Sequence, residues 1–350
     1  MQHDDPQHDS PQHDRPRHVA GAGPRRPGRG RRARRIAAVC GACLLALAVV
    51  TAGAGYLFAN HILSGVRRIP VPALTAPRPG ASMTVLLTTD AAGAGSGKVP
   101  APSAGAADGL ISLIHLDAGK RAGAVISLPP NAVVAVPGHG TRDLGDALAL
   151  GGPSLLVKTV EQLTGVPINH YSVLSFSGAL AVIDALGGVD VDVPYTTTSA
   201  GYTFRRGTDH IDSHSALAYA RQPGVSEIGR EQLQQNLVRA MVSKISQQHL
   251  FHSPTVDYHL IRALAGALSV DSSMNNSQLV SLALGLSNLG SSAGTFVDAP
   301  TTSGSATRGG SKPVHLDHAL STKLWQAIRT GDVAAYALKY PSTVTTPDPA

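Results

Sequence analysis

The stretch from Pro153 to Val193 reads PSLLVKTVEQLTGVPINHYSVLSFSGALAVIDALGGVDVDV and changes repeatedly between two hydrophobic patterns. Leu156, Val157, Val160 and Leu163 share one helical face, and Gly165 follows as a helix stop. Short apolar runs bounded by glycine or polar residues are typical of buried strands. The stretch therefore predicts helix, strand, helix and strand at 153–164, 170–174, 177–186 and 189–193.

The alternation continues on both sides of this stretch. Before it, three short apolar runs predict buried strands at 83–89, 110–116 and 124–128. After it, the pattern is mostly helical, with helices expected at about 214–221, 229–248, 256–268, 276–289 and 317–330. Asp317 is the expected N-cap of the last helix. Alternating strands and helices predict an α/β fold, an α-β-α sandwich with a central mixed sheet.

One uncharged segment near the beginning of the chain, Ile36 to Ala59, is long enough to cross a bilayer. A helix rises about 1.5 Å per residue and the hydrocarbon core is roughly 30 Å thick. Arginines crowd the segment before it, which predicts a cytoplasmic N-terminus and an extracellular main domain. A cleaved signal peptide is the alternative, but its apolar core is usually shorter.

These features divide the chain into five parts. We expect a disordered basic cytoplasmic tail, a single transmembrane helix, a proline-rich linker, an extracytoplasmic domain of α/β type and a C-terminal tail. In order, they cover residues 1–35, 36–59, 60–81, 82–332 and 333–350.

The net charge of +6 belongs almost entirely to residues 1–35, which contain 9 Arg and 4 Asp. Anionic membrane lipid is the expected partner of such a tail. The rest of the chain is nearly neutral, and 35 residues are too few for a DNA-reading domain, so no nucleic-acid partner is expected. The only cysteines, Cys40 and Cys43, lie within the apolar segment and are interpreted as membrane-helix residues.

Four ordered segments carry a resemblance to a known family. They are VEQLTGVPINHY at 160–171, DALGGVDV at 184–191, ALAYAR at 216–221, and Gly229-Arg230 with Gln234-Gln235. Together they resemble the signatures of the LytR–CpsA–Psr family of cell-envelope proteins, and the resemblance covers about residues 82–332.

The resemblance implies a phosphotransferase outside the cell. Such a protein moves a glycopolymer from a polyprenyl pyrophosphate carrier to a peptidoglycan hydroxyl. Cations must neutralise the pyrophosphate as its P–O bond breaks, and the polyprenyl chain needs an apolar groove. The implied partners are the polyprenyl-pyrophosphate-linked glycopolymer and peptidoglycan, and the implied cofactor is Mg²⁺.

Site residues follow from the matching positions. Asp90 and Asp108 match the two aspartates that lie beside the metal ion in the family. The resemblance also implies that Asp108 is catalytic. The alternative is that both aspartates only cap a loop. Arg221 and Arg230 match catalytic and phosphate-binding arginines, and Gln234 matches a further substrate-binding position. His170 fits a structural position, and Arg142, Arg205 and Arg206 are candidate replacements for missing positive charges.

The chain departs from the family pattern at several charged positions. Ala106, Pro130, Pro223 and Leu233 stand where the family has arginine, Asn131 stands for a carboxylate, and Asp143 falls at a lysine position. A hydrogen bond to a charged group contributes about 1.5–3 kcal/mol, so these losses should weaken phosphate binding. The sequence therefore predicts an impaired or altered transferase, or alternatively a non-catalytic module that binds the lipid-linked glycopolymer or the cell wall.

Overall fold

A computed structural model describes residues 63–343 of the chain. The description leaves out 79, 90–109, 120–122, 194, 221, 223–232, 234–235, 239, 242, 246–253, 289–293 and 304–313.

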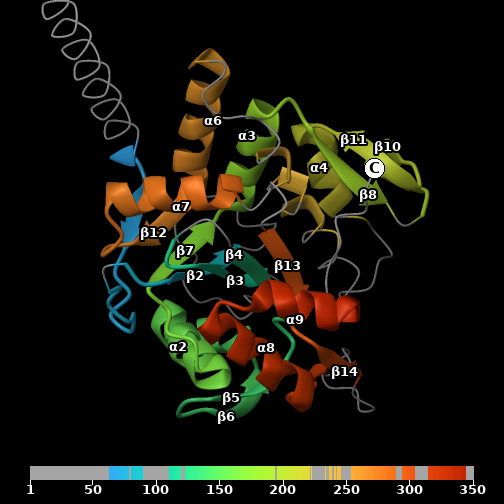
Figure 1. Cartoon of the computed structure of the whole chain (residues 1–350). Helices are drawn as coiled ribbons and strands as arrows, with labels where there is room; N and C mark the ends of the chain where they lie inside the picture. Colours follow the sequence, from blue (N-terminus) through green and yellow to red (C-terminus); the bar gives the residue numbers. More distant parts are fainter. Residues whose placement is uncertain are drawn as a thin grey trace, which may run out of the picture. The chain divides into compact units, whose positions relative to one another are not determined.

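The centre of the fold is a seven-stranded mixed sheet (Figure 1). Its strand order is β1-β12-β7-β2-β3-β4-β13. Strands β2, β4, β7 and β13 run in one direction, and β1, β3 and β12 run in the other. The strands are β1 (Arg67–Ile69), β2 (Met83–Thr89), β3 (Ile111–Leu116), β4 (Gly123–Leu128), β7 (His170–Leu174), β12 (Leu268–Asp271) and β13 (Gly294–Asp298).

Three helices cover one face of this sheet (Figure 1): α2 (Asp146–Thr164), α8 (His318–Thr330) and α9 (Val333–Lys339). Their apolar stripes pack against buried residues of β2, β3 and β4. Leu86, Leu113 and Ile126 are fully buried there and contact the same cluster as Trp325 of α8. Burial of so many large apolar side chains is the main source of the fold's stability.

The opposite face carries α3 (Phe176–Ala185), α6 (Pro254–Ala267) and α7 (Asn276–Asn288) (Figure 1). Residues of α3 and α6 share one buried cluster, and residues of α6 and α7 share another with β2 and β3. Gly178 of α3 lies so close to α6 that an added Cβ would stand 2.3 Å from the Cα of Ala267. Two helical layers around a mixed sheet confirm the predicted α/β sandwich.

Smaller elements complete the fold. Three antiparallel ribbons pair β5 (Val133–Val136) with β6 (Gly140–Asp143), β9 (Thr197–Ser199) with β10 (Tyr202–Phe204), and β8 (Val189–Val193) with β11 (Gly207–Ile211). A fourth pairs β14 (Thr301–Ser303) with β15 (Val314–Leu316). The remaining elements are α4 (Ser213–Ala220), helical turns within 233–245, and the 3₁₀ turn Pro341–Thr343.

The predicted elements between 83 and 193 are confirmed. The C-cap of α2 is Gly165, with a left-handed φ of 63°. Asp317 caps α8 by accepting a hydrogen bond from the Leu320 backbone N–H at 2.9 Å. Helix α2 begins earlier than predicted, at Asp146, and kinks at Gly151 and Gly152, where the predicted Pro153 start lies.

Three predictions need correction. The helices expected at about 214–221, 256–268, 276–289 and 317–330 are present as α4, α6, α7 and α8, but the strands of the second half were missed: β12 and β13 complete the central sheet, and five further strands form ribbons. The segment expected as a linker contains β1, which pairs with β12. The segment expected as a C-terminal tail contains α9, whose Val333 and Tyr336 are buried in the core.

The predicted transmembrane helix at 36–59 and the tail at 1–35 lie outside the described residues. Within the described part of the chain, no helix combines the length and apolarity needed to cross a bilayer.

Candidate active site at the edge of the central sheet

The carboxyl end of β2 and the start of β3 are joined at one edge of the sheet. The Thr89 backbone N–H donates to the Leu110 carbonyl at 3.1 Å, and the Leu110 N–H donates to Thr89 Oγ1 at 2.8 Å. In the sequence, Asp90 directly follows Thr89, and Asp108 precedes Leu110 by two residues. The segment that carries both predicted metal ligands therefore leaves and re-enters the sheet at a single point.

The predicted site residues themselves lie outside the described residues. This holds for Asp90, Asp108, Arg221, Arg230 and Gln234, and also for Ala106, Pro223 and the 91–107 loop. Their assignment as catalytic, phosphate-binding and metal-binding residues stays a prediction. Among the described residues, no cluster of three or more His, Cys, Asp or Glu side chains could hold a metal ion.

An apolar cavity of about 140 Å³ lies behind this edge, between the sheet and the helices of its second face. Leu110 and Leu174 line it: Leu110 is bonded to Thr89 at this edge, and Leu174, the last residue of β7, is paired with Thr89 in the sheet. Helices α6 and α7 and the turns at 238–245 supply the opposite wall. Its lining is almost entirely aliphatic, apart from three serines, so the cavity suits a hydrocarbon chain. The sequence predicted the need for such a groove but not its location.

A larger, open groove of about 690 Å³ lies elsewhere, between α3, α4 and the β9–β10 ribbon. None of its lining residues belongs to the central sheet. The smaller cavity is the better candidate for a lipid-binding site because it adjoins the strand ends that flank Asp90 and Asp108.

Two segments in which the chain departs from the family pattern, at Pro130-Asn131 and at Asp143, lie side by side because backbone hydrogen bonds join residues in and next to them. The Gly145 N–H donates to the Pro130 carbonyl at 2.7 Å, and the Leu144 N–H donates to the Ala132 carbonyl at 2.9 Å. Pro130 is buried and Asn131 is half-buried, beside the half-buried Asp143. Where the family carries Arg, Asp and Lys, this chain therefore carries one negative charge and no positive charge.

Leu233 is accommodated differently. Its side chain is 6% exposed and packs in the same apolar cluster as Leu237 and Met241. Leucine at this position contributes to the core, where a charged guanidinium would be costly to bury.

Gln222 is a buried polar residue that the motif pattern did not indicate. It is 3% exposed, and its Nε2 has no hydrogen-bond partner among the described residues. In the sequence it stands between Arg221 and Pro223, so a buried amide donor lies next to this motif. The one signal in the sequence that could have indicated Gln222 is its position directly after Arg221.

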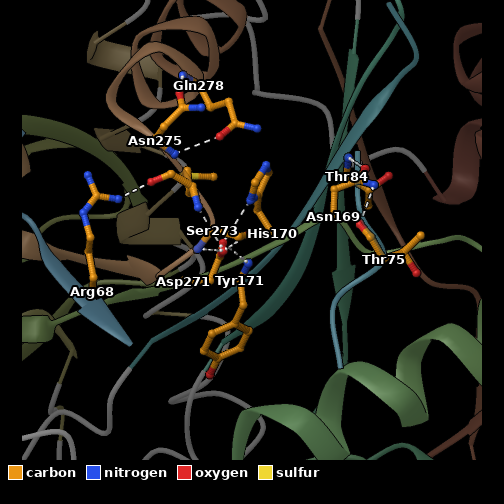
Figure 2. A network of polar contacts seen from close by, with 11 residues as sticks. Arg68, Thr75, Thr84, Asn169, His170, Tyr171, Asp271, Ser273, Asn275 and Gln278 are labelled. Carbon is orange, nitrogen blue, oxygen red and sulfur yellow. Dashed lines mark hydrogen bonds and ion pairs between the residues drawn. The ribbon is translucent and has the colours of Figure 1, made fainter. Parts of the chain in front are cut away.

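The motif residues that the structure describes are structural. Asn169 accepts a hydrogen bond from the Thr84 N–H at 2.9 Å and donates to the Thr75 carbonyl at 3.1 Å (Figure 2). Burial raises the pKa of Tyr171 to about 12, and its hydroxyl bonds Thr88 at 2.8 Å. Burial likewise raises the pKa of Tyr219 to about 12. These described signature residues thus stabilise the scaffold.

His170 is confirmed as a structural residue. Its ring Nδ1 lies 3.0 Å from Asp271 Oδ2, and both side chains are buried (Figure 2). Asp271 also accepts hydrogen bonds from the backbone N–H groups of Tyr171, Ser273 and Met274 and from the Ser273 hydroxyl. Burial alone would raise the pKa of Asp271, but hydrogen bonds from His170 and Ser273 lower it below its ordinary value of 3.8.

The three candidate replacement arginines lie on exposed elements. Arg205 and Arg206 follow β10, and their backbone N–H groups donate to Asp209 and Thr196. Arg142 lies on β6, in the ribbon whose β5 strand packs with α2 on the other face of the sheet from the cavity. For Arg205 and Arg206 this confirms the expected solvated loop.

Comparison with known proteins agrees with the motif resemblance. The model of the LytR_cpsA_psr family matches residues 83–319, which is more than half of the chain. The chain belongs to the LytR_cpsA_psr family. The match includes β2 through the start of α8, so it covers the central sheet apart from β1, together with the cavity and all five predicted site positions.

Two relatives carry the name polyisoprenyl-teichoic acid–peptidoglycan teichoic acid transferase TagU. The protein from Enterococcus faecalis is 29% identical over 162 residues, covering 45% of this chain and 52% of its own length. The protein from Halalkalibacterium halodurans is 32% identical over 149 residues, covering 41% and 49%. The chain spans about half the length of these curated relatives.

A solved structure shares the fold. The LytR-Csp2A-Psr enzyme from Actinomyces oris superimposes with a TM-score of 0.57 at 22% identity, covering 75% of this chain and 95% of that one. The family resemblance and the α/β fold with a mixed sheet are therefore both shown.

Proposed function

We propose that this protein is a membrane-anchored transferase that moves a glycopolymer from a polyprenyl pyrophosphate carrier to peptidoglycan. The observation that carries the proposal is the apolar cavity behind the sheet edge formed by Thr89 and Leu110. The segment that contains Asp90 and Asp108 connects these two residues in the sequence. A hydrocarbon cavity beside a candidate site for an anionic headgroup suits an amphipathic lipid. Relatives named as teichoic acid transferases support the same class of substrate.

In the proposed reaction, a peptidoglycan hydroxyl attacks the phosphorus attached to the glycopolymer. A P–O bond to the polyprenyl phosphate breaks, a phosphodiester forms, and polyprenyl monophosphate leaves. Asp90 and Asp108 are the proposed holders of Mg²⁺, since carboxylate oxygens are its usual protein ligands. The ion would neutralise charge on the pyrophosphate. Arg221 and Arg230 would stabilise the phosphate oxygens, and Gln234 would donate a hydrogen bond.

The proposed activity is weaker than that of a relative with the full motif set. Pro130, Asn131 and Asp143 leave a net negative charge where the family has a net positive one. Each lost charge-assisted bond of about 1.5–3 kcal/mol lowers the rate by roughly 10- to 150-fold.

A transfer assay tests the proposal. The full chain would be mixed with a short glycan on polyprenyl pyrophosphate, Mg²⁺ and peptidoglycan fragments. We expect linked product that disappears in Asp108→Ala and in chelator. The control variant Asp332→Ala changes an exposed carboxylate that makes no capping bond and should retain activity.

The second candidate is a non-catalytic module that binds the lipid-linked glycopolymer. The charge reversal around Asp143 favours it. No product with the wild type, together with carrier binding that Asp108→Ala weakens, would support this second function. Adding the charges back with Asn131→Asp and Asp143→Lys distinguishes the two, because a weakened enzyme should gain activity and a binding module should not.

A further inference from the structure

Three elements form the open groove of about 690 Å³ described above: α3, α4 and the β9–β10 ribbon (Figure 1). Helix α4 packs against both α3 and β10, and its Tyr219 ring meets Phe204 of β10 edge-on, with the ring centroids 5.4 Å apart. We call this site the hairpin groove. Its volume lies within the range of roughly 300–1,000 Å³ that is usual for the binding sites of small ligands.

The hairpin groove is apolar at its base and polar at its rim. Ala218 is buried and Leu180 and Leu217 are half-buried, so these residues form the base. Asp184 and Tyr202 are exposed and form part of the rim. A ligand for such a groove combines a flat apolar face with hydrogen-bonding groups around its edge. A sugar ring has this character, because C–H groups cover its faces and hydroxyl groups project from its edge.

The charge of the hairpin groove argues against the anionic and the hydrocarbon parts of the proposed substrate. Among the described residues, no Lys or Arg lines the groove, and Asp184 contributes a negative charge. A pyrophosphate or a phosphate polymer would therefore be repelled. A hydrocarbon tail would remove water from Asp184 and His214 without offering a hydrogen bond in return. A neutral saccharide meets neither cost, since its hydroxyl groups can bond both side chains.

The turn between β9 and β10 fixes the position of the rim tyrosine. Ser199 and Tyr202 are directly paired, so their side chains share one face of the ribbon, and both residues line the groove. The two turn residues, Ala200 and Gly201, have positive φ values of 49° and 85°. Such turns favour glycine, asparagine or aspartate, so the alanine is strained. Ala200 is the one described non-glycine residue with positive φ, and it also lines the groove. Strained residues of this kind cluster at ligand sites.

The hairpin groove adjoins the start of the predicted phosphate-binding segment. Helix α4 lines the groove as far as Ala218 and ends at Ala220, about 3 Å farther along its axis. In the sequence, Arg221 follows directly. We propose that the hairpin groove binds a neutral sugar unit of the peptidoglycan acceptor against the Tyr202 ring and so presents a nearby hydroxyl to the phosphate at Arg221, an inference that rests on the proposed function for the identity of the acceptor.

Direct binding is measured without any lipid carrier. The full chain in phosphatidylcholine nanodiscs is titrated with the neutral trisaccharide of N-acetylglucosamine and, separately, with a glycerol phosphate trimer, and binding is followed by ligand-observed NMR. We expect the wild type to bind the trisaccharide and not the anionic trimer. Tyr202→Ala should weaken binding of the trisaccharide about tenfold, which corresponds to about 1.4 kcal/mol. No trisaccharide binding by the wild type, tighter binding of the anionic trimer, or equal trisaccharide binding by Tyr202→Ala overturns the proposal.

Matched variants guard this result. Tyr195→Ala is the control for the ring, because Tyr195 is also an exposed tyrosine but lies outside the groove lining, and it should leave the affinity unchanged. A second pair serves if Tyr202→Ala does not fold. Ala181→Gln enlarges an exposed α3 residue that lines the groove and should weaken binding. Ser177→Gln enlarges an exposed residue of the same helix outside the lining and should not. Equal affinities for these two variants overturn the proposal.

The transfer assay separates the hairpin groove from the proposed function. Tyr202→Ala should raise the KM for peptidoglycan fragments about tenfold and leave both kcat and the KM for the lipid-linked glycan unchanged, because a subsite for the acceptor contributes uniform binding. Transfer with an unchanged acceptor KM in Tyr202→Ala would refute the acceptor subsite and retain the transferase. Trisaccharide binding by a chain that transfers nothing would refute the transferase and retain the saccharide site.

Discussion

Replacing Asp271 by asparagine should destabilise the protein strongly while leaving the shape of the site unchanged. The carboxylate is fully buried and accepts hydrogen bonds on both oxygens. Oδ2 faces His170 Nδ1 at 3.0 Å and the Tyr171 N–H at 3.1 Å, and Oδ1 faces the Ser273 and Met274 N–H groups at 2.9 and 3.1 Å (Figure 2). The amide of Asn keeps only one of these two acceptors.

The least costly arrangement for Asp271→Asn keeps the oxygen toward Ser273 and Met274. Its NH₂ then faces His170, which can change tautomer and accept, but the Tyr171 N–H loses its acceptor. One orphaned buried donor costs about 1–3 kcal/mol, and the loss of the charged acceptor adds to this. We expect a loss of about 3 kcal/mol. With a slope near 3 kcal/mol per molar urea, the unfolding midpoint should fall by about 1 M.

The assay is urea unfolding of the full chain at neutral pH, with Asp332→Asn as the exposed control. The difference between wild type and Asp271→Asn should also shrink in acid. Because the folded pKa of Asp271 is lowered, its stabilising contribution is complete above the ordinary value of 3.8 and is lost as the pH falls through the folded pKa. A variant within 0.5 kcal/mol of wild type at neutral pH, on the order of an ordinary surface change, would refute this reasoning.

Two further predictions concern helix geometry. Gly178→Ala should cost at least about 2–3 kcal/mol, because its Cβ would overlap the Ala267 backbone at 2.3 Å and push α3 from α6. Gly266→Ala is its matched control, since a Cβ there meets nothing within 4 Å, and helix propensity predicts a gain of about 0.5–1 kcal/mol. Equal effects in thermal unfolding would contradict the close α3–α6 packing. Asp317→Ala should lower the free energy of unfolding by about 1 kcal/mol in the same experiment, because the Leu320 N–H loses its acceptor at the start of α8. Asparagine is also a good N-cap, so an Asp317→Asn variant destabilised by the same amount would contradict the capping explanation.

Local signals in the sequence were sufficient for elements whose stability is local or whose apolar content is high. Strands β2, β3 and β4 are short segments rich in apolar residues, and α2 ends at Gly165, where the left-handed backbone favours glycine. Asp317 was predicted as a cap for the same reason, because capping involves only residues within one turn. The motif set also identified the family, and with it the expected chemistry.

Strands whose pairing partner is distant in the sequence were missed. β12 has only four residues and begins directly after the last residue of α6, so no turn segment separates the two. It is a strand because it pairs with β7 and β1. Its last residue, Asp271, also forms a hydrogen bond with His170, which is 101 residues away in the sequence. Such contacts depend on the closure of long loops, which composition and periodicity do not encode.

The candidate site was likewise predictable in part from the sequence and in part only from the structure. The sequence alone provided the identities of Asp90, Asp108, Arg221, Arg230 and Gln234, the missing charges, and the need for an apolar groove. Only the tertiary structure decided where that groove lies and that Ser172, Ser112 and Ser127 share its floor. Their alignment follows from strand register, and a shift by one residue would turn each serine to the other face of the sheet.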